Sequence, residues 1–102
     1  MPDPVTVLAQ YRVRSGVEHE FFSVLAQHWP ALRALELVTD HPAQVYLGGE
    51  QGIDGPLVVE LFVWATPDAS TRAHTHPSVS AIWEAMEPLC EARDGRPSME
   101  FS

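Results

Sequence analysis

The sequence predicts an α+β fold in which helices cover one face of a four-stranded antiparallel sheet. The first observation is the order of the segments, because strand-like alternation and helical spacing follow one another as βαββαβ. The second is the composition, with 45% hydrophobic and 20% charged residues, which is typical of a folded globular protein. The third is the length of 102 residues, which suits one hydrophobic core. We therefore expect a single domain over residues 1–102.

The first strand and the first helix are predicted from two different spacings of apolar residues along the sequence. Apolar and polar side chains alternate over residues 5–14, as they do in a half-buried strand. Apolar residues then recur at steps of three and four over residues 21–35, which is typical of a helix with one buried face. Pro30 interrupts the hydrogen bonding of such a helix. Because the apolar spacing continues past Pro30, we expect one bent helix.

The rest of the chain continues the same order of elements. The expected elements are a strand over 43–48, a loop over 48–56, a strand over 57–65, a short helix from 66, a helix over 77–92 and a strand over 96–101. Two helices that bury their apolar faces on one antiparallel sheet form the ferredoxin-like sandwich.

The second face of this sheet is also expected to be apolar. We assign to it four large apolar side chains: Leu8, Val58, Phe62 and Trp64. A face of this kind is too apolar to remain in water, so a second copy of the chain is expected to cover it. The prediction is therefore a homodimer that closes into an α+β barrel. On that face, Arg12 and Glu60 either pair with each other or each reach the rim.

Charge and cysteine content narrow the class of protein. The formal net charge is −8, and all six basic residues are arginines. Such a surface repels phosphate backbones and anionic lipids, so we expect no nucleic acid and no membrane partner. The one cysteine, Cys90, has no internal disulfide partner, and residues 1–4 lack the features of a secretory signal. We therefore expect a cytoplasmic protein.

Three stretches of the chain, taken in order, carry a family resemblance. They are Val7-x-x-Gln10-Tyr11-x-Val13-x-x-Gly16-x-Glu18-x-Glu20-Phe21, then the apolar strand to Trp64, then Ala73-His74-x-x-Pro77 leading into a helix. Over about residues 5–101 the chain resembles the antibiotic biosynthesis monooxygenase-like family of dimeric α+β barrels. The resemblance implies a homodimer with a pocket between sheet and helices in each subunit. It also implies one of the family's activities, which include cofactor-independent oxygenation of quinol-like aromatics and haem degradation.

Haem degradation does not fit the residues present. Haem-degrading members use an Asn on the first strand, whereas this chain contains no Asn and has Ala9 and Gln10 there. They also place a haem-ligating His in the second long helix, and no His occurs between Ser78 and Ala92. We therefore expect no cofactor. No third ligand stands at a diagnostic spacing from His74 and His76, so we expect no metal site either.

Histidines and aromatic residues are the candidates for a functional site. His28 lies on the apolar stripe of the first helix, where it is either a core histidine with a buried partner or a base facing the cleft. We predict catalytic roles for His28 and His74, since a neutral imidazole can accept a phenolic proton. The predicted substrate-binding residues are Tyr11, Trp29, Trp83 and His76. The alternative for the pair His74 and His76 is that one caps the following helix and the other is solvated.

The predicted function is therefore that of a small-molecule enzyme. The leading reading is a cofactor-free monooxygenase or isomerase that acts on an aromatic, quinol-like compound. Two alternatives remain: a binding protein that uses the same pocket without catalysis, and a structural dimer whose core is filled.

Overall fold

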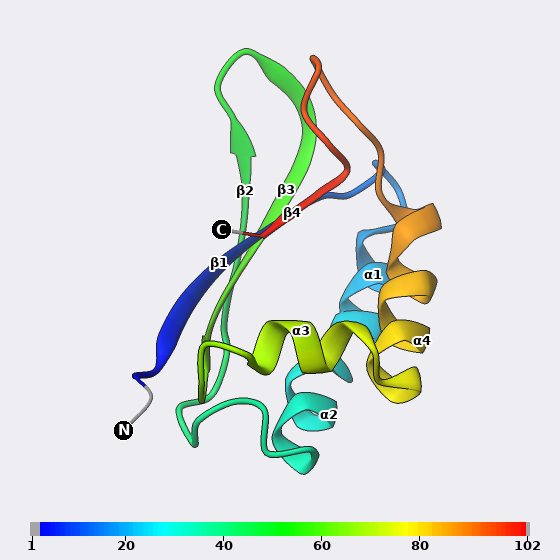
Figure 1. The fold of residues 1–102 in the computed structure, drawn as a ribbon. Helices are drawn as coiled ribbons and strands as arrows, with labels where there is room; N and C mark the ends of the chain where they lie inside the picture. The colour runs from blue at the N-terminus through cyan, green and yellow to red at the C-terminus, as the bar shows by residue number, and fades with distance from the viewer. Residues whose placement is uncertain (1–2, 102) are drawn as a thin grey trace.

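The computed structural model describes residues 3–101, and residues 1, 2 and 102 lie outside this range. Figure 1 shows the elements in order. They are β1 (Val5–Arg12), α1 (Glu18–Leu25), α2 (His28–Ala34), β2 (Gln44–Glu50), β3 (Ile53–Trp64), α3 (Ala69–His74), α4 (Pro77–Met86), the 3₁₀ turn η1 (Glu87–Leu89) and β4 (Met99–Phe101). Within residues 3–101, no helix combines the length and the apolar character needed to cross a membrane.

The four strands form one antiparallel sheet in the order β2-β3-β1-β4. The helices all lie on one side of it (Figure 1). We call the side toward the helices the inner face and the opposite side the outer face. The predicted ferredoxin-like architecture is confirmed.

The inner face is set by the register of β1 against β3. The opposed pairs on this face are Val7 with Phe62, Ala9 with Glu60, and Tyr11 with Val58. All six side chains are buried, because opposed residues of an antiparallel pair point to the same side and this side meets the helices. The prediction that placed Val58, Phe62 and Trp64 on the outer face is therefore wrong. Both alternating sets of β3 are apolar, so alternation alone did not distinguish its two faces.

The outer face is nevertheless apolar, with a different set of residues. Its half-buried side chains on the two central strands are Leu8, Leu57, Val59, Leu61 and Val63. Tyr46 of β2 lies opposite Val59 and is 55% exposed. No described helix or loop covers the middle of this face.

The first helical segment consists of two helices rather than one bent helix. α1 ends at Leu25, α2 begins at His28, and Pro30 is the third residue of α2. The first backbone N–H groups of a helix have no partner within it, so a proline in the first turn removes no hydrogen bond. The expectation of one bent helix was wrong because the chain restarts just before the proline. This break places His28 at the start of α2.

The β2–β3 hairpin is longer than expected, and its turn is confined to Gln51 and Gly52. Most of the segment expected as a loop over 48–56 is therefore strand. Gly55 has φ +112°, and a Cβ on it would overlap the guanidinium of Arg93. That guanidinium donates to the carbonyl oxygens of Pro56, at 2.8 Å, and of Val13. Because Gly55 has no side chain, the guanidinium of Arg93 fits there and connects the hairpin to Val13, the residue that follows β1.

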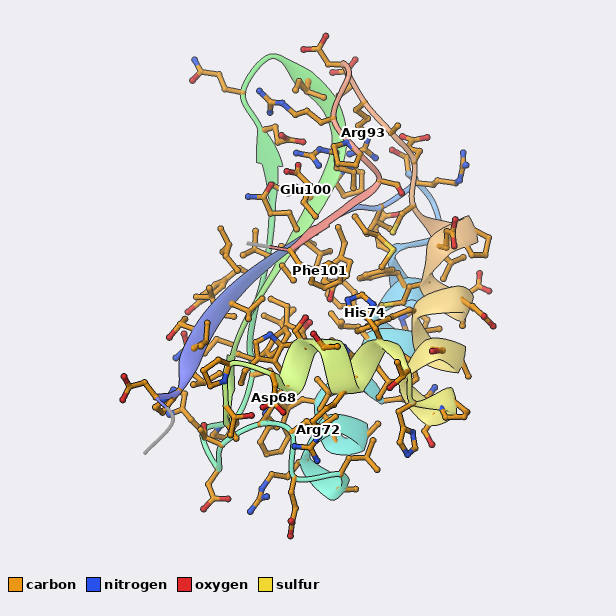
Figure 2. All side chains as sticks on the ribbon, viewed as in Figure 1. Asp68, Arg72, His74, Arg93, Glu100 and Phe101 are labelled. Carbon is orange, nitrogen blue, oxygen red and sulfur yellow. The ribbon has the colours of Figure 1, made fainter. Side chains whose placement is uncertain are left out.

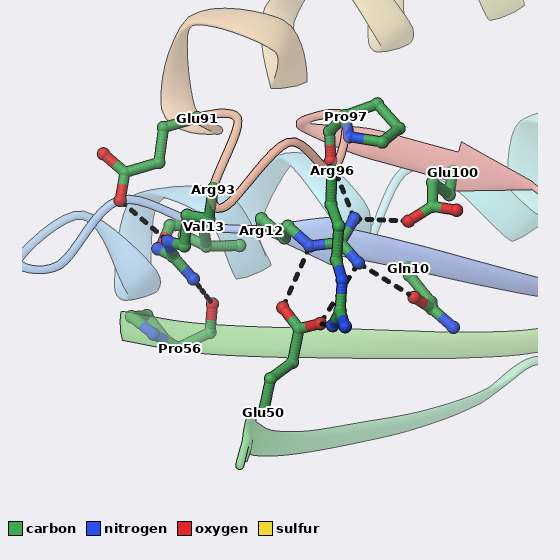
Figure 3. Close-up of polar contacts among 10 residues, drawn as sticks. All are labelled: Gln10, Arg12, Val13, Glu50, Pro56, Glu91, Arg93, Arg96, Pro97 and Glu100. Carbon is green, nitrogen blue, oxygen red and sulfur yellow. Dashed lines mark hydrogen bonds and ion pairs between the residues drawn. The ribbon is translucent and has the colours of Figure 1, made fainter. Parts of the chain in front are cut away.

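Arg12 forms a second polar connection, on the outer face (Figure 3). It is 1% exposed and donates to Glu50 at 2.9 Å, to Glu100 at 2.6 Å and to the Pro97 carbonyl oxygen at 2.7 Å. These bonds join β1 to β2 and to the segment of β4. The hydrogen bond from Arg12 lowers the pKa of the Glu50 carboxyl. The proposed alternative of an Arg12–Glu60 pair is wrong, because Glu60 points to the inner face.

Replacing Gly55 by alanine should destabilise the protein by about 1–3 kcal/mol, because the methyl group meets both a left-handed φ and Arg93. Gly49→Ala is the matched control in the same hairpin, since its nearest atom is at 4.0 Å and its φ is not positive. The control should change stability by less than about 1 kcal/mol. Urea unfolding of both variants measures the difference, and equal midpoints would contradict this account of Gly55.

Candidate functional site

The centre of the site is Glu60, a carboxylate in the middle of the inner face that is 1% exposed. Its Oε1 accepts a hydrogen bond from the Tyr11 hydroxyl at 2.7 Å. His28 Nδ1 lies 2.9 Å from the same oxygen and 3.2 Å from Oε2. A buried carboxylate is tolerated only where donors replace its lost water, and Tyr11 and His28 supply them.

The hydrogen bonds of His28 determine which ring nitrogen carries the proton. Trp83 Nε1 lies 3.0 Å from His28 Nε2. An indole N–H can only donate, so Nε2 accepts and the neutral ring carries its proton on Nδ1. The Nδ1–H then donates to Glu60. Tyr11, His28 and Trp83 therefore form a chain of donors that all point toward the Glu60 carboxylate.

Each member of this chain comes from a different element. Tyr11 and Glu60 lie on the neighbouring strands β1 and β3, where Ala9 is the residue opposite Glu60. His28 reaches down from the start of α2, and Trp83 from α4, which packs against α2. The site thus forms only when α2 and α4 pack over the sheet.

Burial raises the pKa of two side chains, Tyr11 in this hydrogen-bonded group and Cys90. Burial first, and then the neighbouring Glu60 charge, raise the pKa of the Tyr11 hydroxyl well above its ordinary value. Tyr11 is therefore held as a neutral donor. Burial also raises the pKa of the Cys90 thiol to about 11, although Arg93 and Arg14 act in the opposite direction. Cys90 consequently has little thiolate at neutral pH and is a poor nucleophile.

A groove of about 230 Å³ opens beside these hydrogen-bonded residues, with lining residues on β1, β3, α3 and β4. Its lining residues are Val5, Val7, Trp64, Pro67, Ser70 and Phe101. Two series of aromatic contacts connect the groove to His28. Trp64 meets Phe62 at 4.9 Å between ring centroids, and Phe62 meets His28 at 5.6 Å. Phe101 meets Trp83 at 6.0 Å, and Trp83 bonds His28.

The two predicted histidines of the α3–α4 junction have different surroundings. His74 is exposed, and its ring centroid lies 4.6 Å from that of Trp83. Figure 2 labels His74 and Phe101, each of which contacts the ring of Trp83. His76 precedes α4, and its Nδ1 accepts the backbone N–H of Ser78 at 3.2 Å. The capping alternative is therefore correct for His76, and this bond occupies one of its ring nitrogens.

The structure brings together three of the predicted site residues, namely His28, Tyr11 and Trp83, and places His74 against the last of them. Trp29 packs against the core, and no described contact joins it to Glu60 or His28. Its indole N–H is buried without a hydrogen-bond partner among residues 3–101. Within the same residues, no group of three His, Cys, Asp or Glu side chains is arranged to hold a metal ion.

Sequence reasoning missed Glu60 as a site residue. It is the one charge in the most apolar strand, and it was assigned to the outer face beside Arg12. A charge in the middle of such a strand could have indicated a buried polar site, because a carboxylate there needs partners from the covering helices. His28, on the apolar stripe of the first helical segment, was the available partner.

Comparison with known proteins supports the fold. No protein-family model matches the chain, and no curated protein does. Solved structures do match. SnoaB, a cofactor-independent oxygenase from Streptomyces nogalater, superimposes with a TM-score of 0.62 at 24% identity, over 98% of this chain and 91% of that one. A candidate antibiotic biosynthesis monooxygenase from Caulobacter crescentus gives 0.65 at 22%, over 99% and 89%.

A dimeric ferredoxin-like protein of unknown function from Jannaschia gives a TM-score of 0.68 at 10% identity, over 98% of this chain and 96% of that one. The fold and these neighbours define a ferredoxin-like α+β protein. Within that class, the neighbours include antibiotic biosynthesis monooxygenase-like proteins, in agreement with the resemblance found in the sequence. At these identities the similarity establishes the fold.

The raised pKa of Tyr11 predicts a specific response to alkali. The folded state keeps a proton that the unfolded chain releases near pH 10, so stability should be complete below about pH 10 and decrease above it. In a Tyr46→Phe variant, Tyr11 is the only tyrosine. Its tyrosinate absorbance should appear only well above pH 10 and together with loss of the circular dichroism signal. Ionisation near pH 10 in a protein that is still folded would contradict this prediction.

Proposed function

We propose that this protein binds a small hydroxylated aromatic compound between its sheet and its helices and oxygenates it without a cofactor. The observation that carries the proposal is the His28–Glu60 pair, which lies one aromatic ring away from a groove lined by Trp64 and Phe101. A groove of about 230 Å³ is smaller than the roughly 300–1,000 Å³ of pockets for drug-sized ligands, so it suits one or two fused rings.

His28 is the base in this proposal. Its Nε2 takes the phenolic proton, and the resulting imidazolium keeps its Nδ1–H on the Glu60 carboxylate, whose charge stabilises it. Glu60 is a positioning residue that fixes the tautomer, and Tyr11 fixes Glu60. The apolar rings around His28 keep water away from the phenolate that forms.

The electrons for oxygenation come from the substrate. A phenolate conjugated to an activated ring CH₂ is electron-rich enough to react with molecular oxygen. One oxygen atom replaces the two hydrogens of the CH₂ as a carbonyl, and the other oxygen leaves with those two hydrogens as water. The reaction therefore needs no reductant beyond the substrate itself.

Binding without catalysis is the second candidate function. It is favoured by one observation, namely that both ring nitrogens of His28 are already hydrogen-bonded, to Glu60 and to Trp83. A protein of this kind would take up the same aromatic compound in the groove and release it unchanged. Oxygen consumption with bound compound distinguishes the two functions.

We further propose that the protein is a cytoplasmic homodimer joined through its outer sheet faces. Leu57, Val59, Leu61 and Val63 form an apolar surface that no described element covers. Proteins with the same fold from Jannaschia and from Bacteroides fragilis are dimeric. Pairing the two sheets face to face removes this surface from water and forms a barrel.

The proposed base predicts the effect of removing it. With a panel of hydroxylated aromatic compounds that carry an activated ring CH₂, the wild-type protein should consume oxygen, and His28→Ala should reduce the rate by about 10²–10⁴-fold. Glu60→Gln should reduce it less, because an amide can still accept from Nδ1–H. His19→Ala, an exposed histidine of α1, is the control and should keep the full rate. Circular dichroism checks that each variant is folded.

Absence of oxygen uptake across the panel, in a protein that binds the compounds, would favour the binding function instead. An unchanged rate in folded His28→Ala would remove His28 from the mechanism.

The proposed dimer predicts different outcomes for adjacent residues of β3. Leu61→Asp places a charge on the outer face and should give a folded monomer of 11.3 kDa, about half the mass of the wild-type species. Phe62→Asp is the matched variant on the inner face and should unfold the protein, because it buries an unpaired charge. Light scattering with circular dichroism measures both. A wild-type protein that is already monomeric at micromolar concentration would exclude the proposed dimer.

A further inference from the structure

Trp83 lies between the buried His28 and two exposed side chains. Its indole N–H donates to Nε2 of His28 at 3.0 Å, and its ring lies against His74 and Phe101, with centroids 4.6 and 6.0 Å away. Both of these neighbours are exposed, and Trp83 itself is half-buried. The indole therefore has a hydrogen bond to the buried His28 and ring contacts with two exposed side chains, His74 and Phe101.

The position that the indole N–H occupies has a defined hydrogen-bonding character. Because Nδ1–H is committed to Glu60, Nε2 offers a lone pair and accepts. A group that takes the place of the indole must therefore donate. A phenolic O–H meets this requirement, whereas an ether or a ketone leaves Nε2 buried without a partner, which is unfavourable.

The surroundings of this position select flat rings. Phe62 presents its edge to His28 at an interplanar angle of 87°, and Phe62 and Trp64 are perpendicular to within 5°, at 85°. Phe101 belongs both to the groove lining and to the contacts of Trp83. A ligand in the groove therefore meets the indole through Phe101, and an outward rotation of Trp83 would join the groove to His28.

We propose that Trp83 is a displaceable cap on His28, and that the ligand of this site is a planar aromatic compound whose hydroxyl group replaces the indole N–H on Nε2. This inference rests on the proposed function in placing the ligand at His28. It adds that the resting protein holds its base covered by a side chain that resembles the ligand, a flat bicyclic ring with one donor. Trp83 is then a positioning and specificity residue rather than a catalytic one.

The test uses a pair of probes that differ in one donor, 2-naphthol and 2-methoxynaphthalene. In the wild-type protein, the indole N–H resonance that is missing from Trp83→Phe should shift on saturation with 2-naphthol and stay in place with the methyl ether. Trp83→Phe keeps a ring over His28 but removes the hydrogen bond that the ligand must break. It should therefore bind 2-naphthol about 2- to 10-fold more tightly than the wild-type protein does.

His28→Phe should bind 2-naphthol and the ether equally, because the acceptor is gone. An unmoved Trp83 resonance while 2-naphthol binds would overturn the inference, and so would equal affinity of the wild-type and Trp83→Phe proteins. Failure of 2-naphthol to saturate Trp83→Phe, where no indole N–H occupies Nε2, would overturn it as well.

These readouts are independent of turnover. A shifted Trp83 resonance without any oxygen uptake would support the inference about Trp83 and contradict the proposed oxygenation. Oxygen uptake with an unmoved resonance would support the oxygenation and contradict the inference about Trp83.

Discussion

The burial of one carboxylate constrains the whole interior of this protein. Glu60 lies at the centre of the inner sheet face, where a charge without donors would cost several kcal/mol. Its donors are Tyr11 on β1 and His28 on α2, and Trp83 on α4 donates in turn to His28. The hydrogen bonds therefore act across both layers, and they fix how the helices are placed over the sheet in a way that apolar packing alone does not.

The parts of the fold that local periodicity determines could be predicted from the sequence. The inward face of β1 was correctly identified, since Val7, Ala9, Tyr11 and Val13 share it and Gln10 and Arg12 mark the other face, where Leu8 is the exception. β3 was assigned the wrong way round. Its two faces are equally apolar, and its one charge was taken to point outward. The partners that bury Glu60 are 32 and 49 residues away in sequence, beyond the range of any local pattern.

The sequence indicated that histidine and aromatic residues contribute to the candidate site. It did not show which side chains bond to one another. His28 was recognised as a histidine on an apolar stripe that needs a partner, and the structure supplies Glu60 and Trp83. The break before Pro30, which sets His28 at the beginning of α2, depends on where the chain can restart a helix, and the continuous apolar spacing concealed it.

The common direction of the hydrogen bonds around Glu60 has a consequence for the orientation of the His28 ring. Nδ1 contacts Glu60 at 2.9 Å, and Nε2 accepts from the Trp83 indole at 3.0 Å. A flip of the ring would bring carbon atoms to both contacts, so the carboxylate would lose a donor and the indole N–H would lose its acceptor. The ring is therefore held in one orientation, with Nδ1 toward the sheet and Nε2 toward α4.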